Sequence, residues 1–441
     1  MGIGTCKTEV IAKNKYIILH MKMVLKKLLL LGCILSMAAK STPAQTLGCT
    51  DFQANNYKSG ATLNDGSCTY NSTSYSPIKL IDKLSDTLIE TSALINIDGE
   101  LWTLDDSGNP NAIYHFDKAT GAVLQTIFIS NATNHDWEDM TADQNNIYIG
   151  DFGNNNGNRT NLAVYKIPKS LLSKKKVDSV VAEKINFSYA DQKDFNSNNN
   201  ANNFDCEAMF VWNDSLHLLT KDWINGHSKH YLLPTTPGSY NLFPIDSLDA
   251  GCLITGAAFA PLSKRIVLTG YNKTGFCYIW LLWDFTGSKI FSGNKRKIDF
   301  GFFTNTGQIE GVCFNDTNNI YITNEKNIVN NNLYAAQVGQ WMNKKSTGVD
   351  YHKQNITELQ VYPNPASTEI YITYNLQKPA AVSYCIYNRE GKLVSCSKKK
   401  LGGGKVVQKT DIASLSHGTY YLVVHSENAN TERRVFIKEV K

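Results

Sequence analysis

Several features that would assign a common function class are missing from this sequence. Beyond the N-terminal region no apolar run approaches the roughly 20 residues that a membrane-spanning helix needs, so no transmembrane segment is expected in the mature chain. Basic residues exceed acidic ones by only five charges and form no compact stripe with interleaved aromatics, which argues against a nucleic-acid partner. No G-x-S-x-G motif occurs, so a serine hydrolase of the nucleophile-elbow type has no support.

Cysteine is present without a metal-binding pattern. The chain has ten cysteines, but no C-x-x-C and no histidine at zinc-ligand spacing, which argues against a zinc site. Cys49 and Cys68 bracket a small polar segment and are the predicted disulfide, worth about 3 kcal/mol in the chain-entropy model. Four others lie mostly in apolar strand patterns, where buried unpaired thiols are expected: Cys206, Cys252, Cys277 and Cys313.

The N-terminus has the order of a secretion signal. Lys26 and Lys27 precede the apolar run 28–39, and small and turn residues follow it. This order of basic, apolar and small residues is typical of a signal peptide. We predict a signal peptide with an extended basic region over residues 1–45, cleaved near Ala44 or Gln45. The mature protein is then exported to a compartment where disulfides persist.

Residues 46–70 form a small polar module bounded by the predicted disulfide. Its pattern resembles a short cysteine module that recurs in proteins exported by the type IX secretion route of Gram-negative bacteria. The motifs that carry the resemblance are Gly48-Cys49-Thr50-Asp51, Asn56-Tyr57 and Asp65-Gly66-Ser67-Cys68. Asp51, Asn64 and Asp65 are candidate calcium ligands, but Asn64-Asp65-Gly66 is also a turn signature, and we favour the turn.

Residues 76–345 are strand-like throughout and carry an internal repeat. Short alternating runs of Tyr, Ile, Val, Phe and Trp are separated by Asn, Asp and Gly clusters, which indicates strands and turns. Five units begin at spacings of 48 to 69 residues, and each offers three or four strands, which predicts a five-bladed β-propeller. A six-bladed ring is the alternative, because the longest interval has room for a further element.

The fourth strand of each unit decides how the ring closes. Four units contain a run that predicts this strand: 123–129, 180–187, 242–248 and 289–300. The fifth unit lacks one, and Ile78–Leu84, which precedes the first unit, is expected to supply it. That pairing would join the first and last blades.

Acidic residues recur at the start of the units. In a propeller the first strand of each blade lines the central channel, so equivalent positions form a ring. Glu begins this strand in four units, and Thr255 takes the place in the other. The predicted channel and ligand residues are Glu90, Glu138, Glu207 and Glu310, with Asp106, Asp151 and Lys221 in a second tier and Arg159 nearby.

Four like charges around a narrow channel require raised pKa values or a bound cation. Because hard oxygen ligands favour Ca²⁺ or Mg²⁺, the four glutamates are predicted metal ligands, and Ca²⁺ is the expected cofactor. The alternative is structural: each Glu would accept backbone N–H bonds from the neighbouring blade and hold the two blades together.

The middle domain also resembles a known group. The repeats, with Asp136–Asp139, Gly150–Asn155 and Arg159, resemble a bacterial propeller group described as esterase-like and compared with propeller phytases. This resemblance implies carboxylates that hold Ca²⁺ and basic residues for phosphate, a role open to Lys221 and Arg159. The compact arginine- and lysine-rich substrate site of a phytase is not evident.

Two functions therefore stay open for the middle domain. One is a surface module that binds an extracellular ligand at the channel mouth. The other is a metal-dependent hydrolase of phosphate or other esters. We favour binding, because propellers without a recognisable catalytic cluster are commonly scaffolds.

The last segment, 357–441, follows a linker over 346–356 and is again strand-like. Its motifs resemble, in order, those of the C-terminal sorting domain of type IX secretion. This resemblance implies an immunoglobulin-like β-sandwich, the secretion machinery as partner, and a protein released from the cell or held on its outer surface. The residues that carry it are Tyr362, Pro363, Asn364, Pro365, Gly391, Lys392, Gly418, Tyr420 and Lys438.

A fusion experiment tests the sorting assignment. A reporter that carries the signal peptide and residues 355–441 should reach the surface or medium of a host with type IX secretion. The same reporter without residues 355–441 should stay in the periplasm, because a signal peptide directs export across the inner membrane only. Cell fractionation measures the distribution, and equal export of both fusions would contradict the assignment.

Overall fold

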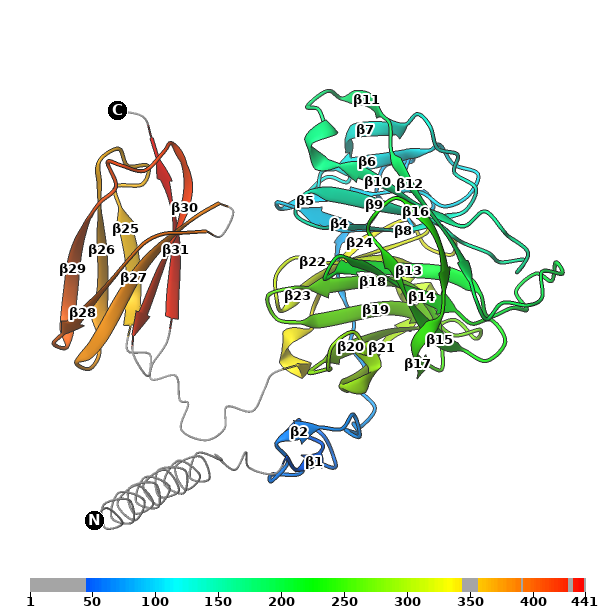
Figure 1. Cartoon of the computed structure of the whole chain (residues 1–441), viewed down its shortest axis with the longest axis horizontal. Helices are drawn as coiled ribbons and strands as arrows, with labels where there is room; N and C mark the ends of the chain where they lie inside the picture. Colours follow the sequence, from blue (N-terminus) through cyan, green and yellow to red (C-terminus); the bar gives the residue numbers. More distant parts are fainter. Residues whose placement is uncertain (1–44, 343–355, 390–391, 427–430, 440–441) are drawn as a thin grey trace, which may run out of the picture. The chain divides into compact units, whose positions relative to one another are not determined.

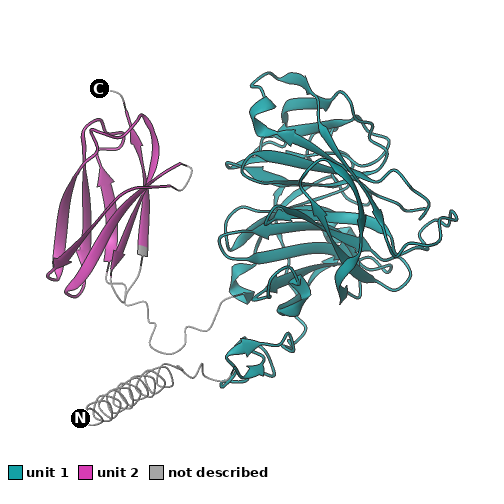
Figure 2. Cartoon of the chain, in the orientation of Figure 1, with its two compact units in different colours: residues 1–342 teal, residues 343–441 magenta. Residues whose placement is uncertain are grey.

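The computed structural model describes residues 45–342, 356–389, 392–426 and 431–439. The predicted signal peptide (except Gln45), the linker (except Ile356) and Gly391 lie outside these ranges. The chain divides into two units, residues 1–342 and 343–441 (Figure 2). Helical elements are short: η1 (Lys169–Leu171), η2 (Ile290–Ser292), α2 (Phe303–Thr306) and η3 (Gly339–Trp341). No helix in the described ranges is long and apolar enough to cross a membrane.

The first unit contains five mainly antiparallel sheets, numbered here in chain order (Figure 1). Sheet 1 is β4 (Ile95–Ile97), β5 (Glu100–Thr103), β6 (Ala112–Phe116), β7 (Val123–Ile129) and β11 (Val177–Val180). Sheet 2 is β8 (Trp137–Ala142), β9 (Asn146–Asp151), β10 (Ala163–Pro168), β12 (Glu183–Tyr189) and β16 (Gly238–Leu242). Sheet 3 is β13 (Asp205–Trp212), β14 (Ser215–Lys221), β15 (His227–Pro234) and β17 (Pro244–Asp249).

Sheet 4 is β18 (Leu253–Ala260), β19 (Arg265–Tyr271), β20 (Phe276–Trp283) and β21 (Asn294–Phe302). Sheet 5 is β22 (Ile309–Phe314), β23 (Asn319–Asn324), β24 (Leu333–Gln337) and β3 (Ile78–Ile81). The first strands contact one another in a closed cycle: β4 with β8, β8 with β13, β13 with β18, β18 with β22, and β22 with β4.

The N-terminal strand completes the last sheet. β3 pairs antiparallel with β24, with Leu333 opposite Ile81 and Ala335 opposite Ile78. This confirms the expectation that residues from 78 onward supply the fourth strand of the fifth unit. Apolar clusters fill the space between neighbouring sheets, and one that contains Leu101 and Leu333 joins sheet 5 to sheet 1. The apolar core of the five sheets therefore forms a closed cycle, as the contacts of the first strands do.

Two connecting segments each add a strand to the preceding sheet. β11 pairs in parallel with β7 of sheet 1, and β16 pairs in parallel with β12 of sheet 2. The expected fourth strands at 180–187 and 242–248 are therefore each divided between two sheets: β11 and β16 are the fifth strands of sheets 1 and 2, and β12 and β17 are the fourth strands of sheets 2 and 3. Part of the longest interval between units is used for β11 and for loops.

One buried carboxylate links three sheets at the centre of the cycle. Asp139, on β8, accepts hydrogen bonds from the backbone N–H groups of Met140 (2.7 Å), Met209 on sheet 3 (2.6 Å) and Ala257 on sheet 4 (3.3 Å). The other first strands have small residues here: Ala93, Ala208, Gly256 and Gly311. A Cβ atom at Gly256 would lie 2.3 Å from the carbonyl oxygen of Glu310, so the backbones approach too closely for a side chain.

The polar module holds the predicted disulfide and docks on sheet 4. Cys49 and Cys68 are joined at 2.02 Å, and β1 (Leu47–Gly48) pairs with β2 (Leu63–Asn64). Asn64 Oδ1 and Asp65 Oδ1 accept backbone N–H bonds from Gly66 and Ser67, which is a turn geometry. Several hydrogen bonds reach the sheet, including Asn64 Nδ2 to Asn294 Oδ1 at 2.7 Å and Arg296 to Gln53 at 2.9 Å.

The second unit is a two-sheet sandwich around one apolar core. One sheet is β25 (Ile356–Tyr362), β26 (Glu369–Leu376) and β29 (Gly404–Asp411); the other is β28 (Leu393–Leu401), β27 (Ala380–Asn388), β30 (Gly418–Ser426) and β31 (Thr431–Lys438). The Tyr362–Pro365 motif is tied to β31, because Asn364 accepts from Ile437 N (2.8 Å) and donates to the Val435 carbonyl (3.0 Å).

Cysteine pairing is resolved in both units. Cys385 and Cys396, which face each other on β27 and β28, form a second disulfide. The remaining cysteines of the described ranges are buried and unpaired, as expected from their apolar surroundings: Cys206, Cys252, Cys277 and Cys313.

Replacing Asp139 by Ala should destabilise the first unit strongly. Three buried N–H groups would lose their acceptor, and each such loss costs about 1–3 kcal/mol, so we expect a loss of roughly 3–9 kcal/mol. Urea titration of the purified protein measures it. Asp82→Ala removes an exposed carboxylate paired with Lys79 and should change stability by less than about 1 kcal/mol. Equal effects of the two variants would show that Asp139 does not hold the sheets together.

Candidate functional site

The first strand of each sheet has an irregularity at the same place. The last regular pairs before it are Thr91–Asp105, Trp137–Asp151, Cys206–Thr220, Ile254–Gly270 and Ile309–Asn324, and the register then shifts by one residue. The residues that follow these pairs are Ser92, Glu138, Glu207, Thr255 and Glu310. A β-bulge leaves its extra residue unpaired and redirects the side chain. Three of the predicted glutamates therefore occupy equivalent bulge positions.

Glu90 is placed differently from the other three glutamates. It lies two residues before Ser92, level with Asp136, Asp205 and Gln308. Its carboxylate accepts a hydrogen bond from Asn109 at 2.5 Å. The expected ring of four equivalent glutamates is thus a ring of three, next to a second level that contains Glu90, Asp136 and Asp205.

The residues predicted for the second tier occupy two different equivalent positions of the repeat. Asp106 is level with Lys221, Tyr271 and Glu325, whereas Asp151 is level with Asp105. The repeat pattern missed five carboxylates of this region: Asp105, Asp136, Asp139, Asp205 and Glu325. The sequence does mark these positions. Asp136 and Asp205 lie two residues before a bulge glutamate, Asp139 lies one residue after it, and Asp105 and Glu325 follow the second strand of their sheets.

At two of the bulge positions a hydroxyl group links neighbouring sheets. Ser92 Oγ donates to the carbonyl of Trp137 at 3.2 Å, and Thr255 Oγ1 donates to that of Ile309 at 2.8 Å. Glu310 instead accepts from Gln308 at 2.9 Å. Oε1 of Glu138 is buried and has no hydrogen-bond partner within the described ranges.

Three carboxylates converge at this end of sheets 1 and 2. Oxygen atoms of Asp106, Asp136 and Glu138 all lie within 4.8 Å of one another. Glycine at position 153 makes room for them, because a Cβ atom there would lie 2.1 Å from Glu138 Oε1 and 2.5 Å from Asp136 Oδ2. We call Asp106, Asp136 and Glu138 the acidic triad.

Burial and mutual repulsion change the ionisation of these groups. Burial, followed by repulsion from Asp106 and Asp205, raises the pKa of Asp136 to about 7. Burial and the charge of Asp106 also raise the pKa of Glu138 well above its usual value. The pKa values of Asp105 and Glu325 are raised to about 7 as well, chiefly by burial. A nearby cation would reverse these shifts, since opposite charge favours the ionised form.

Lys221 is the cation inside this acidic region. Its ammonium lies 3.0 Å from Glu207, and both side chains are buried. It also lies 4.8 Å from the ring centroid of Trp223 and 5.4 Å from that of Tyr271. Burial opposes the charge, but Glu207 and the other carboxylates raise the pKa of Lys221 well above its usual value. Lys221 is therefore engaged as a counter-ion.

Arg159 is engaged in the same way at the edge of the site. Its guanidinium bonds to Asp151 at 2.8 Å and to the carbonyl of Gly153 at 2.6 Å. These contacts fix the backbone of Gly153 beside the triad. Two asparagine-rich loops lie close by, since Asn154 N donates to Asp205 and Asn200 N donates to the carbonyl of Asn155.

Comparison with known families concerns the second unit. Residues 360–438 match the family "Secretion system C-terminal sorting domain". The match shows that the protein is exported by type IX secretion, to be secreted or placed on the cell surface. No curated protein matches the sequence.

The similar solved structures have low sequence identity to this chain and low TM-scores. A chain of the mitotic checkpoint complex has 16% identity and a TM-score of 0.28 over 56% of this chain, which spans 64% of that protein's length. A candidate 6-phosphogluconolactonase of Bacteroides uniformis has 11% identity and a TM-score of 0.31, over 73% of this chain and 88% of that one.

A third similar structure is the exo-β-1,3-galactanase of Phanerochaete chrysosporium with β-1,3-galactotriose. It has 10% identity and a TM-score of 0.38, over 82% of this chain and 99% of that one. TM-scores this low carry no argument about the fold or the function of this chain.

The raised carboxyl pKa values predict a pH dependence of stability. In the unfolded chain Asp105, Asp136 and Glu325 lose their protons near pH 4, but in the folded protein they keep them until about pH 7. Because the folded state binds more protons between these values, the free energy of unfolding should fall from pH 5 to 7 and level off above. Urea titrations in EDTA measure this, and Asp136→Asn should flatten the slope. Stability that rises over this interval would contradict the assignment.

Proposed function

We propose that residues 76–345 form a five-bladed β-propeller that binds Ca²⁺ at the mouth of its channel and, through the ion, an extracellular ligand. The cyclic contacts of the five first strands and the pairing of β3 with β24 support the propeller. In this arrangement each sheet is one blade, and the bulge residues lie around the axis. Export by type IX secretion brings this site to the outside of the cell.

The acidic triad is the observation that carries the proposal. Three carboxylates whose oxygen atoms lie within 4.8 Å repel one another, and the buried Oε1 of Glu138 lacks a hydrogen-bond donor in the described ranges. A hard divalent cation removes both costs, since Ca²⁺ takes six to eight oxygen ligands. Asp106, Asp136 and Glu138 would hold it, and the gap beside Gly153 leaves room for their oxygens.

Protein oxygens of the triad fill only part of such a coordination shell. Water or ligand oxygens would complete it, which favours a ligand rich in hydroxyl, carboxylate or carbonyl groups. The asparagine-rich loops beside Asp205 add amide donors at the same end of the channel. A metal-dependent ester hydrolase is the second candidate function. It receives less support, because Lys221 and Arg159, the expected phosphate contacts, are both paired with carboxylates.

Calcium should stabilise the protein through the triad. At a hundredfold excess over the dissociation constant, binding to the folded state adds about 2.7 kcal/mol. Glu138→Gln and Asp136→Asn should abolish this gain. Glu310→Gln is the matched control, because Glu310 is an equivalent bulge residue outside the triad, and it should keep the gain. Thermal unfolding with EDTA and with Ca²⁺ measures the stability of all three variants. If only Glu310→Gln lost the stabilisation by Ca²⁺, the ion would not bind at the triad.

Hydrolysis is tested on the same protein. The purified chain is incubated with phosphate esters and carboxyl esters, with and without Ca²⁺. The binding proposal expects no turnover that depends on the triad. Turnover that is lost with EDTA and in Glu138→Gln would instead establish the hydrolase.

A further inference from the structure

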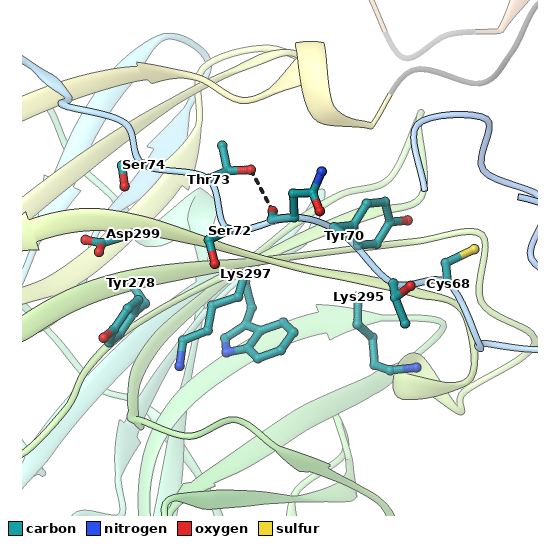
Figure 3. A pocket seen from close by; sticks show the side chains of 12 residues that line it. Cys68, Tyr70, Ser72, Thr73, Ser74, Tyr278, Lys295, Lys297 and Asp299 are labelled. Atoms are coloured by element: carbon teal, nitrogen blue, oxygen red, sulfur yellow. Dashed lines mark hydrogen bonds between the residues drawn. The ribbon is translucent and has the colours of Figure 1, made fainter. Parts of the chain in front are cut away.

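A cavity lies away from the acidic triad, on the outer half of sheet 4. Its volume is about 510 Å³, within the range of small-ligand sites, and residues 68–74 form one wall (Figure 3). Strands β20 and β21 form the other wall. The cavity is thus built from the chain that follows the Cys49–Cys68 disulfide and from the two outer strands of one sheet.

Two aromatic side chains line the wall formed by β20. Tyr278 and Trp280 are two residues apart on β20, so their side chains lie on the same face of the sheet. Both are half-buried. Trp280 Nε1 donates to the carbonyl of Ala250 at 3.2 Å, which fixes the indole. The ammonium of Lys297 lies 3.9 Å from the centroid of the Tyr278 ring. Both rings are therefore held in place by the protein itself.

The charges of the cavity are already satisfied by the backbone. Lys297 Nζ donates to the carbonyls of Ala250 (2.9 Å) and Gly251 (3.1 Å). Lys295 Nζ donates to those of Gly66 (3.1 Å), Phe291 (2.9 Å) and Gly293 (3.1 Å). An anionic ligand would gain little from ammonium groups held in this way, so the cavity favours a neutral ligand.

Hydroxyl and carboxylate groups lie on the same sheet face as the two rings, because Asp299 pairs with Tyr278 across β21 and β20. Ser74 forms a parallel bridge with Asp299, so their side chains share a side of the extended sheet. Asp299 Oδ1 accepts from Gly301 N at 2.7 Å. Within the described ranges, its Oδ2 and the hydroxyls of Ser72 and Ser74 have no hydrogen-bond partner. Figure 3 labels Ser72, Ser74, Asp299, Tyr278 and Lys297 among the side chains that line the cavity.

We propose that this cavity binds a neutral carbohydrate. The apolar face of a pyranose ring packs on the rings of Trp280 and Tyr278, since aromatic side chains offer large, rigid contact area. Sugar hydroxyls are both donors and acceptors, and they pair with Ser72, Ser74 and the free oxygen of Asp299. The site is separate from the acidic triad and does not depend on the Ca²⁺ proposal.

The disulfide module positions the polar wall. Cys68 itself lines the cavity, and residues 73–75 are fixed on β21, because Asp299 N donates to the Thr73 carbonyl and Tyr75 N donates to that of Asp299, both at 2.8 Å. Stacking of Arg296 on Tyr70, 5.0 Å from the ring centroid, adds a further contact. The module thus completes a site that sheet 4 alone would leave open on one side.

Titration calorimetry of the full chain with defined oligosaccharides tests the proposal. The neutral probes are cellohexaose, xylohexaose, mannohexaose, laminarihexaose and maltohexaose, and hexagalacturonate is the anionic probe. At least one neutral probe should bind. Trp280→Ala should weaken that binding at least tenfold, and the double variant Ser72→Ala/Ser74→Ala, which changes exposed side chains only, should weaken it three- to tenfold.

Two controls separate this site from the channel and from general surface effects. Phe243→Ala removes an exposed aromatic elsewhere, 69% accessible, and should leave affinity unchanged. EDTA and Glu138→Gln should also leave it unchanged. Binding by hexagalacturonate alone, binding by no probe, or binding that depends on Glu138 but not on Trp280 and the two serines would each overturn the proposal.

Discussion

The packing of the first strands depends on one contact. In it, the Asp139 carboxylate accepts hydrogen bonds from backbone N–H groups of three sheets. The first strands come so close there that the other sheets have only alanine or glycine at this position. One carboxylate closes the gap and satisfies donors that would otherwise be buried without partners. Removing the carboxyl group would leave these buried donors without an acceptor, which costs free energy, so Asp139 stabilises the close approach of the three sheets.

That closeness explains the chemistry at the end of the first strands. Equivalent positions of five sheets converge there, so the acidic residues that four of the sheets carry at these positions meet at short range. The molecule balances this charge in two ways: Lys221 neutralises Glu207, and Arg159 neutralises Asp151. Within the described ranges the acidic triad has no such ion pair, so it either keeps protons or takes up a cation. The same repetition that builds the fold therefore also brings the three carboxylates of the triad together.

Much of this architecture could be predicted from the sequence, and the exceptions have physical causes. The strand repeat, the return of β3 to the last sheet and three of the glutamate positions follow from alternation and period. Glu90 was misplaced because a hydroxyl residue, Ser92, occupies the bulge position of sheet 1. Asp136 and Asp205 were missed because a bulge changes which side chains lie together. The parallel pairings of β11 and β16 are contacts between units, which no pattern within one unit can show.

The pairing of β3 with β24 joins a strand that is synthesised early to one that is synthesised near the end of the first unit. Sheet 5 stays open at its edge until a strand made near the beginning of the domain returns to it, and the sorting unit is made only after β24. A chain that stops early lacks both its closing contact and its address for export. A truncated chain without β24 therefore also lacks the sorting unit, so only chains that contain both strands of the closing pair carry the segment for export.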